Sequence, residues 1–385
     1  MDQIYLDHAA TTPVLPEVID AVIDCLKNDF GNPSSMHKLG IQAEKRIKDA
    51  KYQVSEVIRV DPEEIIFTSG GTEANNLAIF GTAYDKRRIG THCITTAIEH
   101  PSVLSSFEHL EKQGYEVTYL PVDHNGVISL ESFENALRPD TILVSMMQVN
   151  NEIGAIQPIQ KIGAMMKGMK TKPVFHVDAI QSYGKLPLYP RDWDVDLVSI
   201  SGHKIHAPKG VGALYKRKGV RLQPLIMGGG QQGGLRSGTE NITGIVGMGV
   251  GASLVGQRLL HDSQYLYQLK EQLVLDIKSA LPGVVINGNE RDSAPHILNI
   301  AFPGLRGEVL LHTLEGEGVF VSTGSACSSK DKKISHVLKA IGLDDKTAEG
   351  AIRISISYLT TQSEIKSFIP ILVQSVKQVE KFTRR

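Results

Sequence analysis

Apolar residues recur along the chain first at helical spacing and then in short strand-like runs. Within residues 16–28 every third or fourth position is apolar, which predicts a helix that begins at a proline. One face of this helix is made of Ile19, Val22, Ile23 and Leu26. A second stripe predicts another helix and consists of Ile47, Ala50, Val54, Val57 and Ile58. The subsequent runs predict strands at 64–68, 92–97, 116–120, 142–149, 174–177, 196–200 and 212–215.

The pattern of apolar, polar and glycine residues changes again after residue 215. A glycine-dense stretch covers 228–238, a glycine-spaced apolar segment comes next, and a polar helix is expected at 261–280. Further strands are expected at 297–302 and 352–357, and further helices at 307–315, 334–341 and 363–382. Alternating strands and helices predict an α/β fold with a mostly parallel sheet. We expect a large domain of residues 15–255 and a smaller α/β domain of residues 1–14 and 256–385.

Composition narrows the class of protein. Hydrophobic residues make up 41% and charged residues 22% of 385 residues, and the net charge is −1. This balance, without a single-sign block, argues against nucleic acid or a membrane surface as a partner. The beginning of the chain lacks the pattern of a signal peptide, and three widely spaced cysteines form no disulfide framework. We therefore expect a cytoplasmic protein.

Residues 65–75 predict a strand, a glycine turn and the start of a helix. Such a turn presents backbone N–H groups to an anion, and the Thr72 hydroxyl lies beside them. A phosphate site is one interpretation, and a tight turn capped by Ser69 or Thr72 is the other. The spacing is neither that of a P-loop nor that of a dinucleotide fingerprint, so ATP and NAD are poor candidates.

Two further strand ends carry candidate chemistry. Asp178 ends a buried strand, where open α/β sheets bind ligands, and could pair with a protonated ring nitrogen or simply cap the next segment. Lys204 comes after another strand and could form a Schiff base, or be an ordinary loop lysine. His203 and His206 could suggest a metal pair, but no third ligand is evident, so no metal is expected.

Together, a phosphate cradle, an acid for a ring nitrogen and an imine-forming lysine are what pyridoxal phosphate requires. Cys327 adds a nucleophile: its Gly, Ser and Lys neighbours predict an exposed loop in which a thiolate is favoured. The other two cysteines are expected to be buried and inert.

At this point the sequence resembles the cysteine desulfurases, on the NifS and IscS branch of the class V aminotransferases. The resemblance covers residues 5 to about 361. Eight motifs occur in the family's order: YLDHAATTP, FGNPSS, SGGTEANN, VNNEIG, HVDAIQ, SGHKIHAPKG, RSGTEN and GSACSS. It implies the pyridoxal-phosphate-dependent transferase fold (fold type I) and a homodimer.

The resemblance also implies residue roles. Lys204 would hold the cofactor covalently, Asp178 would pair with the ring nitrogen, and Gln181 would bond the phenolic oxygen. His100 would stack on the ring and assist proton transfer. The phosphate would be held by Gly71, Thr72, Ser201 and His203, with Thr239 from the other subunit. The substrate would be bound by Asn32, Asn151 and Arg353, and Cys327 would accept sulfur.

The implied reaction converts L-cysteine to L-alanine and leaves a persulfide on Cys327. The sulfur would pass to a protein acceptor, either an iron–sulfur scaffold or a tRNA-thiolation enzyme. Two departures from the family pattern occur. Ile356-Ser357-Tyr358-Leu359 stands where relatives often have Gly-Arg-Phe, which concerns a secondary contact. The chain also lacks the longer tail with which some relatives dock an iron–sulfur scaffold, which concerns docking by that route. Alternatives are a selenocysteine lyase or aminotransferase, or a catalytically silent sulfur carrier or scaffold partner.

Overall fold

A mixed seven-stranded sheet forms the centre of the molecule. The computed structural model describes residues 3–323 and 334–383. The strand order is β2-β8-β7-β6-β5-β3-β4, in which only β8 runs antiparallel to its neighbours. The strands are β2 (Ile65–Thr68), β3 (His92–Thr96), β4 (Glu116–Leu120), β5 (Thr141–Met147), β6 (Val174–Asp178), β7 (Leu197–Ser201) and β8 (Gly212–Lys216). The seven strands expected up to residue 215 are therefore confirmed.

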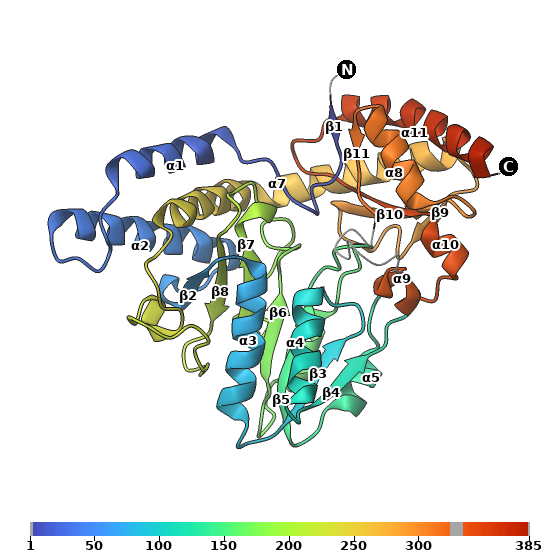
Figure 1. The fold of residues 1–385 in the computed structure, drawn as a ribbon. Helices are drawn as coiled ribbons and strands as arrows, with labels where there is room; N and C mark the ends of the chain where they lie inside the picture. The colour runs from blue at the N-terminus through green and yellow to red at the C-terminus, as the bar shows by residue number, and fades with distance from the viewer. Residues whose placement is uncertain (1–2, 324–333, 384–385) are drawn as a thin grey trace.

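Helices cover both faces of this sheet because consecutive strand residues point to opposite sides. Val144 and Phe175 pack with one group of helices, whereas their neighbours Leu143 and Val174 pack with the other. The first group comprises α2 (Lys38–Ile58), α5 (Leu130–Ala136), α6 (Ile159–Met166) and part of α7 (Ile242–Ala280). The second comprises α3 (Gly71–Lys86) and α4 (Pro101–Lys112), which lie in front of the sheet in Figure 1.

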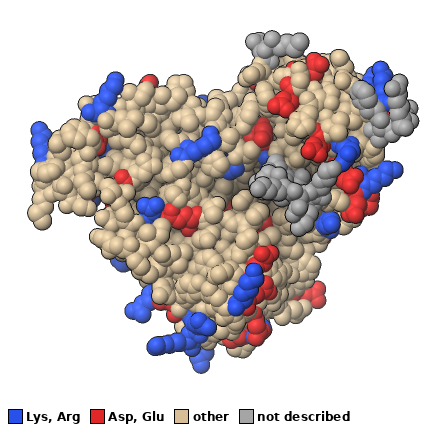
Figure 2. Space-filling view, viewed as in Figure 1, with Lys and Arg blue, Asp and Glu red and all other residues tan. Residues whose placement is uncertain are grey.

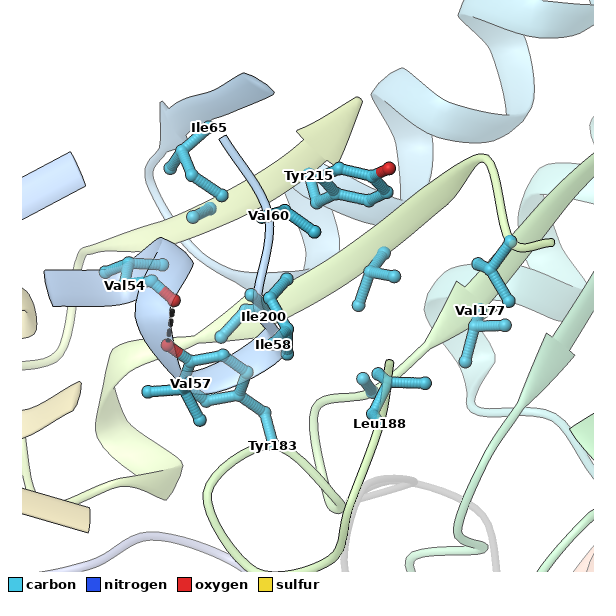
Figure 3. Packing of buried hydrophobic residues seen from close by; sticks show 14 of the residues in the cluster. Val54, Val57, Ile58, Val60, Ile65, Val177, Tyr183, Leu188, Ile200 and Tyr215 are labelled. Atoms are coloured by element: carbon cyan, nitrogen blue, oxygen red, sulfur yellow. Dashed lines mark hydrogen bonds between the residues drawn. The ribbon is translucent and has the colours of Figure 1, made fainter. Parts of the chain in front are cut away.

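The core on the α2 side contains a buried tyrosine that ties a helix to the sheet. The Tyr183 hydroxyl donates a 2.7 Å hydrogen bond to the Val54 carbonyl, while its ring packs among aliphatic side chains (Figure 3). The bond satisfies a polar atom that would be costly to bury alone. Three short helical turns complete this part of the chain: η1 (Pro62–Glu64), η2 (Gly202–Lys204) and η3 (Gln232–Gly234).

A second core lies beside a three-stranded antiparallel sheet. Its strands are β9 (Val285–Asn287), β10 (Ile297–Ala301) and β12 (Ala351–Ser355), in the order β12-β10-β9. The N-terminal strand β1 (Ile4–Tyr5) joins it through a parallel pair with β11 (Val319–Phe320). The helices here are α8 (Gly307–Gly316), α9 (His336–Ala340), α10 (Asp345–Glu349) and α11 (Gln362–Thr383).

One 39-residue helix, α7, runs through both cores (Figure 1). Ile245 to Val255 contribute to the first core, and Leu266 to Ile277 contribute to the second. The glycine-spaced apolar segment and the polar helix expected at 261–280 are thus parts of one helix. Its glycines permit close packing: a Cβ on Gly249 would lie 2.8 Å from Ala50 Cα. The domain bounds 15–255, 1–14 and 256–385 stay a prediction, with the division at a point inside α7.

The first helix, α1 (Pro16–Asn28), has the expected bounds but leaves its predicted apolar face largely exposed. Ile19, Ile23 and Leu26 keep 44%, 43% and 62% of their surface, while Val18 and Cys25 are buried. Cys93 is also buried, as expected. Within the two described ranges, no helix has the length and apolarity needed to cross a membrane.

Candidate active site

A cavity of about 430 Å³ opens beside the carboxyl ends of β5, β6 and β7. Ligands in open α/β sheets bind at this edge. Ten of the expected site residues line it: Gly71, Thr72, His100, Asn151, Asp178, Gln181, Ser201, His203, Lys204 and Arg353. Segments distant in sequence therefore converge on one site, which also includes Asp7, Ser102, Ser322 and Thr323.

The Asp178 carboxylate is buried and lines the cavity. One oxygen accepts from Asn75 Nδ2 at 2.8 Å, and the other accepts from the Ile180 backbone N–H at 2.9 Å. Burial raises its pKa, although these donors and the nearby His100 and Lys204 oppose the shift. None of the ion pairs among the described residues includes Asp178. A buried carboxylate of this kind favours a cationic partner in the cavity.

The glycine turn before α3 borders this cavity and a second hollow beside it. Gly70 is the N-cap, and no side chain from the described residues caps the helix, so capping by Ser69 or Thr72 is wrong as an explanation. A Cβ on Gly71 would lie 2.1 Å from Ile180 Cδ1, so a larger residue would require the Ile180 side chain to move. Thr72, Ser201 and His203 border both spaces. A 16-residue helix with uncapped N–H groups can bind an anion here.

Lys204 points back across the cavity from η2. Its Nζ donates to the carbonyls of Ala9 and Ala10, each at 2.6 Å. Gln181 Nε2 donates to the same Ala9 carbonyl at 2.9 Å, while Gln181 Oε1 is buried without a partner in the described part of the chain. The lysine is partly buried in the site and is not an ordinary exposed loop residue.

His100 is the N-cap of α4 and is held by Ser102. Its Nδ1 accepts from the Ser102 N–H at 3.1 Å and lies 2.9 Å from the Ser102 hydroxyl. Accepting at Nδ1 places the ring proton of the neutral form on Nε2. Burial lowers the pKa of His100, with Lys204 and His336 adding to the shift against Asp178. The neutral imidazole therefore offers a proton at Nε2.

The opposite end of the cavity is built around Arg353 on β12. Its Nη2 donates to Asp7 Oδ1 at 2.7 Å, its Nη1 donates to the Asn151 carbonyl at 2.8 Å, and its Nε is buried without a partner among residues 3–323 and 334–383. A guanidinium fixed on two sides suits recognition of a carboxylate. Asp7 and Arg353 are 346 positions apart, so tertiary packing creates this end.

Two of the expected site residues that the structure describes do not line the cavity. Asn32 is exposed and its side chain accepts from Ser34 N. Thr239 is exposed beyond the glycine-dense stretch. Cys327 lies outside the described residues. His203 and His206 bond Thr11 and the Pro13 carbonyl, and in the described ranges no cluster of three or more metal-ligating side chains occurs.

Sequence reasoning missed the residues that support the expected ones. Asn75 orients Asp178, Ser102 orients His100 and Asp7 orients Arg353. Asn75 lies one helical turn past the glycine turn, and Ser102 lies two positions after His100. Those spacings are a usable signal, whereas nothing local marks Asp7 as a partner of Arg353.

The chain belongs to the class V aminotransferase family, which matches residues 4–368. Cysteine desulfurase IscS of Clostridium botulinum is 43% identical over 378 residues, which cover 98% of this chain and 95% of that protein. Human cysteine desulfurase is 44% identical, covering 99% and 83%. A solved structure described as a NifS-like protein superposes with a TM-score of 0.92 at 38% identity, covering 98% and 100%.

The cofactor of this family is pyridoxal phosphate, and the cavity fits it. Within the described residues, Asp178 is a buried carboxylate with donors but no ion pair, Gln181 Oε1 is a buried acceptor without a partner, and Gly71 lines the cavity at the start of an uncapped helix. An amine, an acid and an anion cradle face one space, which matches an aldehyde, a ring nitrogen and a phosphate.

Proposed function

We propose that the protein is a cysteine desulfurase that uses pyridoxal phosphate to remove sulfur from L-cysteine. The observation that carries this proposal is the enclosure of Lys204, Asp178, His100 and Arg353 in one cavity. Full-length relatives named cysteine desulfurase support the same activity. A protein that only carried sulfur or served as a scaffold would not require this set.

Bound pyridoxal phosphate would supply an aldehyde for the substrate amine and a ring that accepts an electron pair. Lys204 would hold the cofactor covalently and be released as the substrate binds. Asp178, kept in place by Asn75 and Ile180 N–H, would keep the ring nitrogen protonated. His100 would pack against the ring and move a proton at Nε2, and Gln181 would bind the phenolic oxygen. Gly71, Thr72, Ser201 and His203 would hold the phosphate.

Substrate orientation is assigned to the Arg353 end of the cavity. Arg353, with Asn151 beside it, would bind the substrate carboxylate, and Asn32 would approach from its exposed loop. Cys327 would then attack the substrate sulfur: the carbon–sulfur bond breaks, a sulfur–sulfur bond forms and L-alanine leaves. Atoms balance, because cysteine plus a thiol gives alanine plus a persulfide.

Wild-type protein and Cys327→Ser provide the decisive experiment. Both should bind cofactor, seen as a visible absorbance band, and both should show a spectral change with L-cysteine. Only the wild type should form persulfide and alanine in equal amounts, and sulfide when a reductant is present. Normal sulfur transfer by Cys327→Ser would exclude the assigned role, and a reaction with selenocysteine alone would favour a lyase for that substrate.

A homodimer is part of the proposal. The exposed apolar residues on α1 and the exposed Thr239, which lies outside its own cavity, both support a second copy at this side. Thr239 would then reach the partner's phosphate site. Sedimentation equilibrium should give twice the 42.0 kDa chain mass, and Ile23→Glu should lower that mass together with cofactor affinity.

The sulfur acceptor would be a protein, either an iron–sulfur scaffold or a tRNA-thiolation enzyme, in the cytoplasm. Acidic and basic side chains are interspersed on the face shown in Figure 2, which supports the absence of direct nucleic-acid binding and of membrane attachment. Incubating the persulfide form with each candidate acceptor and measuring transferred sulfur tests this part.

A further inference from the structure

A second lysine, Lys185, lies behind the cofactor lysine. It comes directly after Gly184 in the turn beyond β6, and its Nζ donates a 2.9 Å hydrogen bond to the backbone carbonyl of Lys204. The turn is closed by bonds from Lys185 N and Leu186 N to the Ser182 carbonyl. A Cβ on Gly184 would lie 2.5 Å from Val255 Cγ2, so the turn packs closely against α7.

The environment of Lys185 is basic. Burial, with a smaller contribution from the charge of Lys204, lowers its pKa to about 7. The titratable groups that interact electrostatically with Lys185 are Lys204, His203, His206, His8 and His296. None of the carboxylates in the described ranges forms an ion pair with Lys185. Stabilising the fold through a salt bridge is therefore not its role.

The main chain around Lys204 is strained and held from outside. His206, two residues further on, has a φ of 61°, which non-glycine residues adopt only under constraint. Thr12 binds the His203 carbonyl through both its N–H and its hydroxyl, and the hydroxyl accepts from His206 N. The Lys204 carbonyl is fixed by Lys185.

We infer that Lys185 is a positioning residue whose Nζ fixes the Lys204 carbonyl and thereby directs the Lys204 amine into the cavity. The peptide that carries this carbonyl begins at the Lys204 Cα, from which the reactive side chain extends. Rotation of that peptide would displace the amine from the position at which it condenses with the cofactor aldehyde, losing water. This inference rests on the proposed role of Lys204.

The experiment measures the rate at which apoprotein attaches added pyridoxal phosphate, monitored by the absorbance of the covalent form. Lys185→Met should slow attachment roughly 10- to 100-fold, the range expected for loss of one hydrogen bond from a charged donor. Lys185→Arg keeps a cationic donor and should restore most of the rate. If Lys185→Met does not fold, Lys185→Gln serves as the second uncharged variant.

Lys270 offers a matched control. It is buried, burial lowers its pKa to about 7, and its Nζ donates to Ser293 Oγ and the Ala294 carbonyl, away from the cavity. Lys270→Met should lower the thermal midpoint yet attach cofactor at the wild-type rate. Wild-type attachment by Lys185→Met, or equal slowing by Lys270→Met, would overturn the inference. A wild-type protein unable to attach the cofactor would instead overturn the proposed function.

Discussion

The two ends of the cavity are built in different ways. Asp178, Lys204 and the Gly71 turn follow β6, β7 and β2 of one sheet, and Lys204 also binds the carbonyls of Ala9 and Ala10. We call this end the cofactor wall. The substrate wall consists of Asp7, Asn151 and Arg353, which come from the N-terminal segment, the large sheet's edge and the second sheet. The main residues of the cofactor wall thus come from one sheet, whereas those of the substrate wall come from separate parts of the chain that tertiary packing brings together.

Removing the amine of the cofactor wall should have the largest effect. Lys204→Ala should attach no cofactor covalently and lose at least ~10³-fold in turnover, because none of the other described residues lining the cavity is a lysine. Absorbance and alanine formation measure the two effects. Lys218→Ala, which changes an exposed lysine outside both spaces, is the control and should behave as wild type. Equal losses in both variants would contradict a specific role for Lys204.

Changing the substrate wall should separate binding of substrate from binding of cofactor. Arg353→Lys keeps a charge but loses the two-sided fork, so KM for L-cysteine should rise roughly 10- to 100-fold. Cofactor attachment should stay at the wild-type level. Arg258→Lys, which alters a 3.2 Å ion pair with Asp262, should leave KM unchanged. A loss of cofactor in Arg353→Lys would show that the two walls are not independent.

Weakening the support of Asp178 should have a smaller effect on the cofactor wall. Asn75→Ala removes one donor to the buried carboxylate, which should weaken cofactor binding about 5- to 50-fold. Burial already raises the pKa of Asp178, and losing the donor should raise it further, so the defect should grow as pH falls. Titration with cofactor at several pH values measures this. Asn287→Ala, a buried asparagine bonded to Asn299, should leave the affinity unchanged.

The smallest effect on turnover is expected at Glu99, which precedes His100 and does not line the cavity. Its carbonyl lies 3.0 Å from His336 Nε2 of α9, and burial raises the pKa of its side chain from 4.5 to about 8. Because the folded protein keeps the Glu99 proton to higher pH than the unfolded chain does, Glu99 contributes its full stability below pH 4.5. That contribution is lost as the pH rises through 8. The free energy of unfolding of the wild type should therefore fall by up to roughly 5 kcal/mol between pH 4.5 and pH 8. Glu99→Gln should not show this fall.

At pH 7 the folded protein should already carry a protonated Glu99, so Glu99→Gln should keep turnover within about twofold of wild type. Chemical denaturation across the pH range measures the stability difference between the two proteins. The idea fails if that difference is the same at pH 5 and pH 8.

The contrast between the walls also explains how far the sequence could predict the molecule. The cofactor wall lies in βα turns whose glycine, acid and lysine are visible as local patterns, and the large sheet is predicted by apolar runs. The pair of Asp7 and Arg353 has no local signature, because only tertiary packing brings β1 and β12 together. Strands of two residues, such as β1 and β11, are too short to show alternation. The two halves of α7 differ in residue pattern because each half packs into a different core, so the pattern did not predict one continuous helix.

The continuity of α7 has a consequence for how this chain can vary. In an α-helix each added residue rotates the remainder of the helix by about 100° and advances it by about 1.5 Å. An insertion between Val255 and Leu266 would therefore rotate the apolar face of the second core away from its partners. Variation in length should be tolerated in surface loops but not in this stretch. Here α7 fixes how the part of the molecule that carries the substrate wall is rotated relative to the part that carries the cofactor wall.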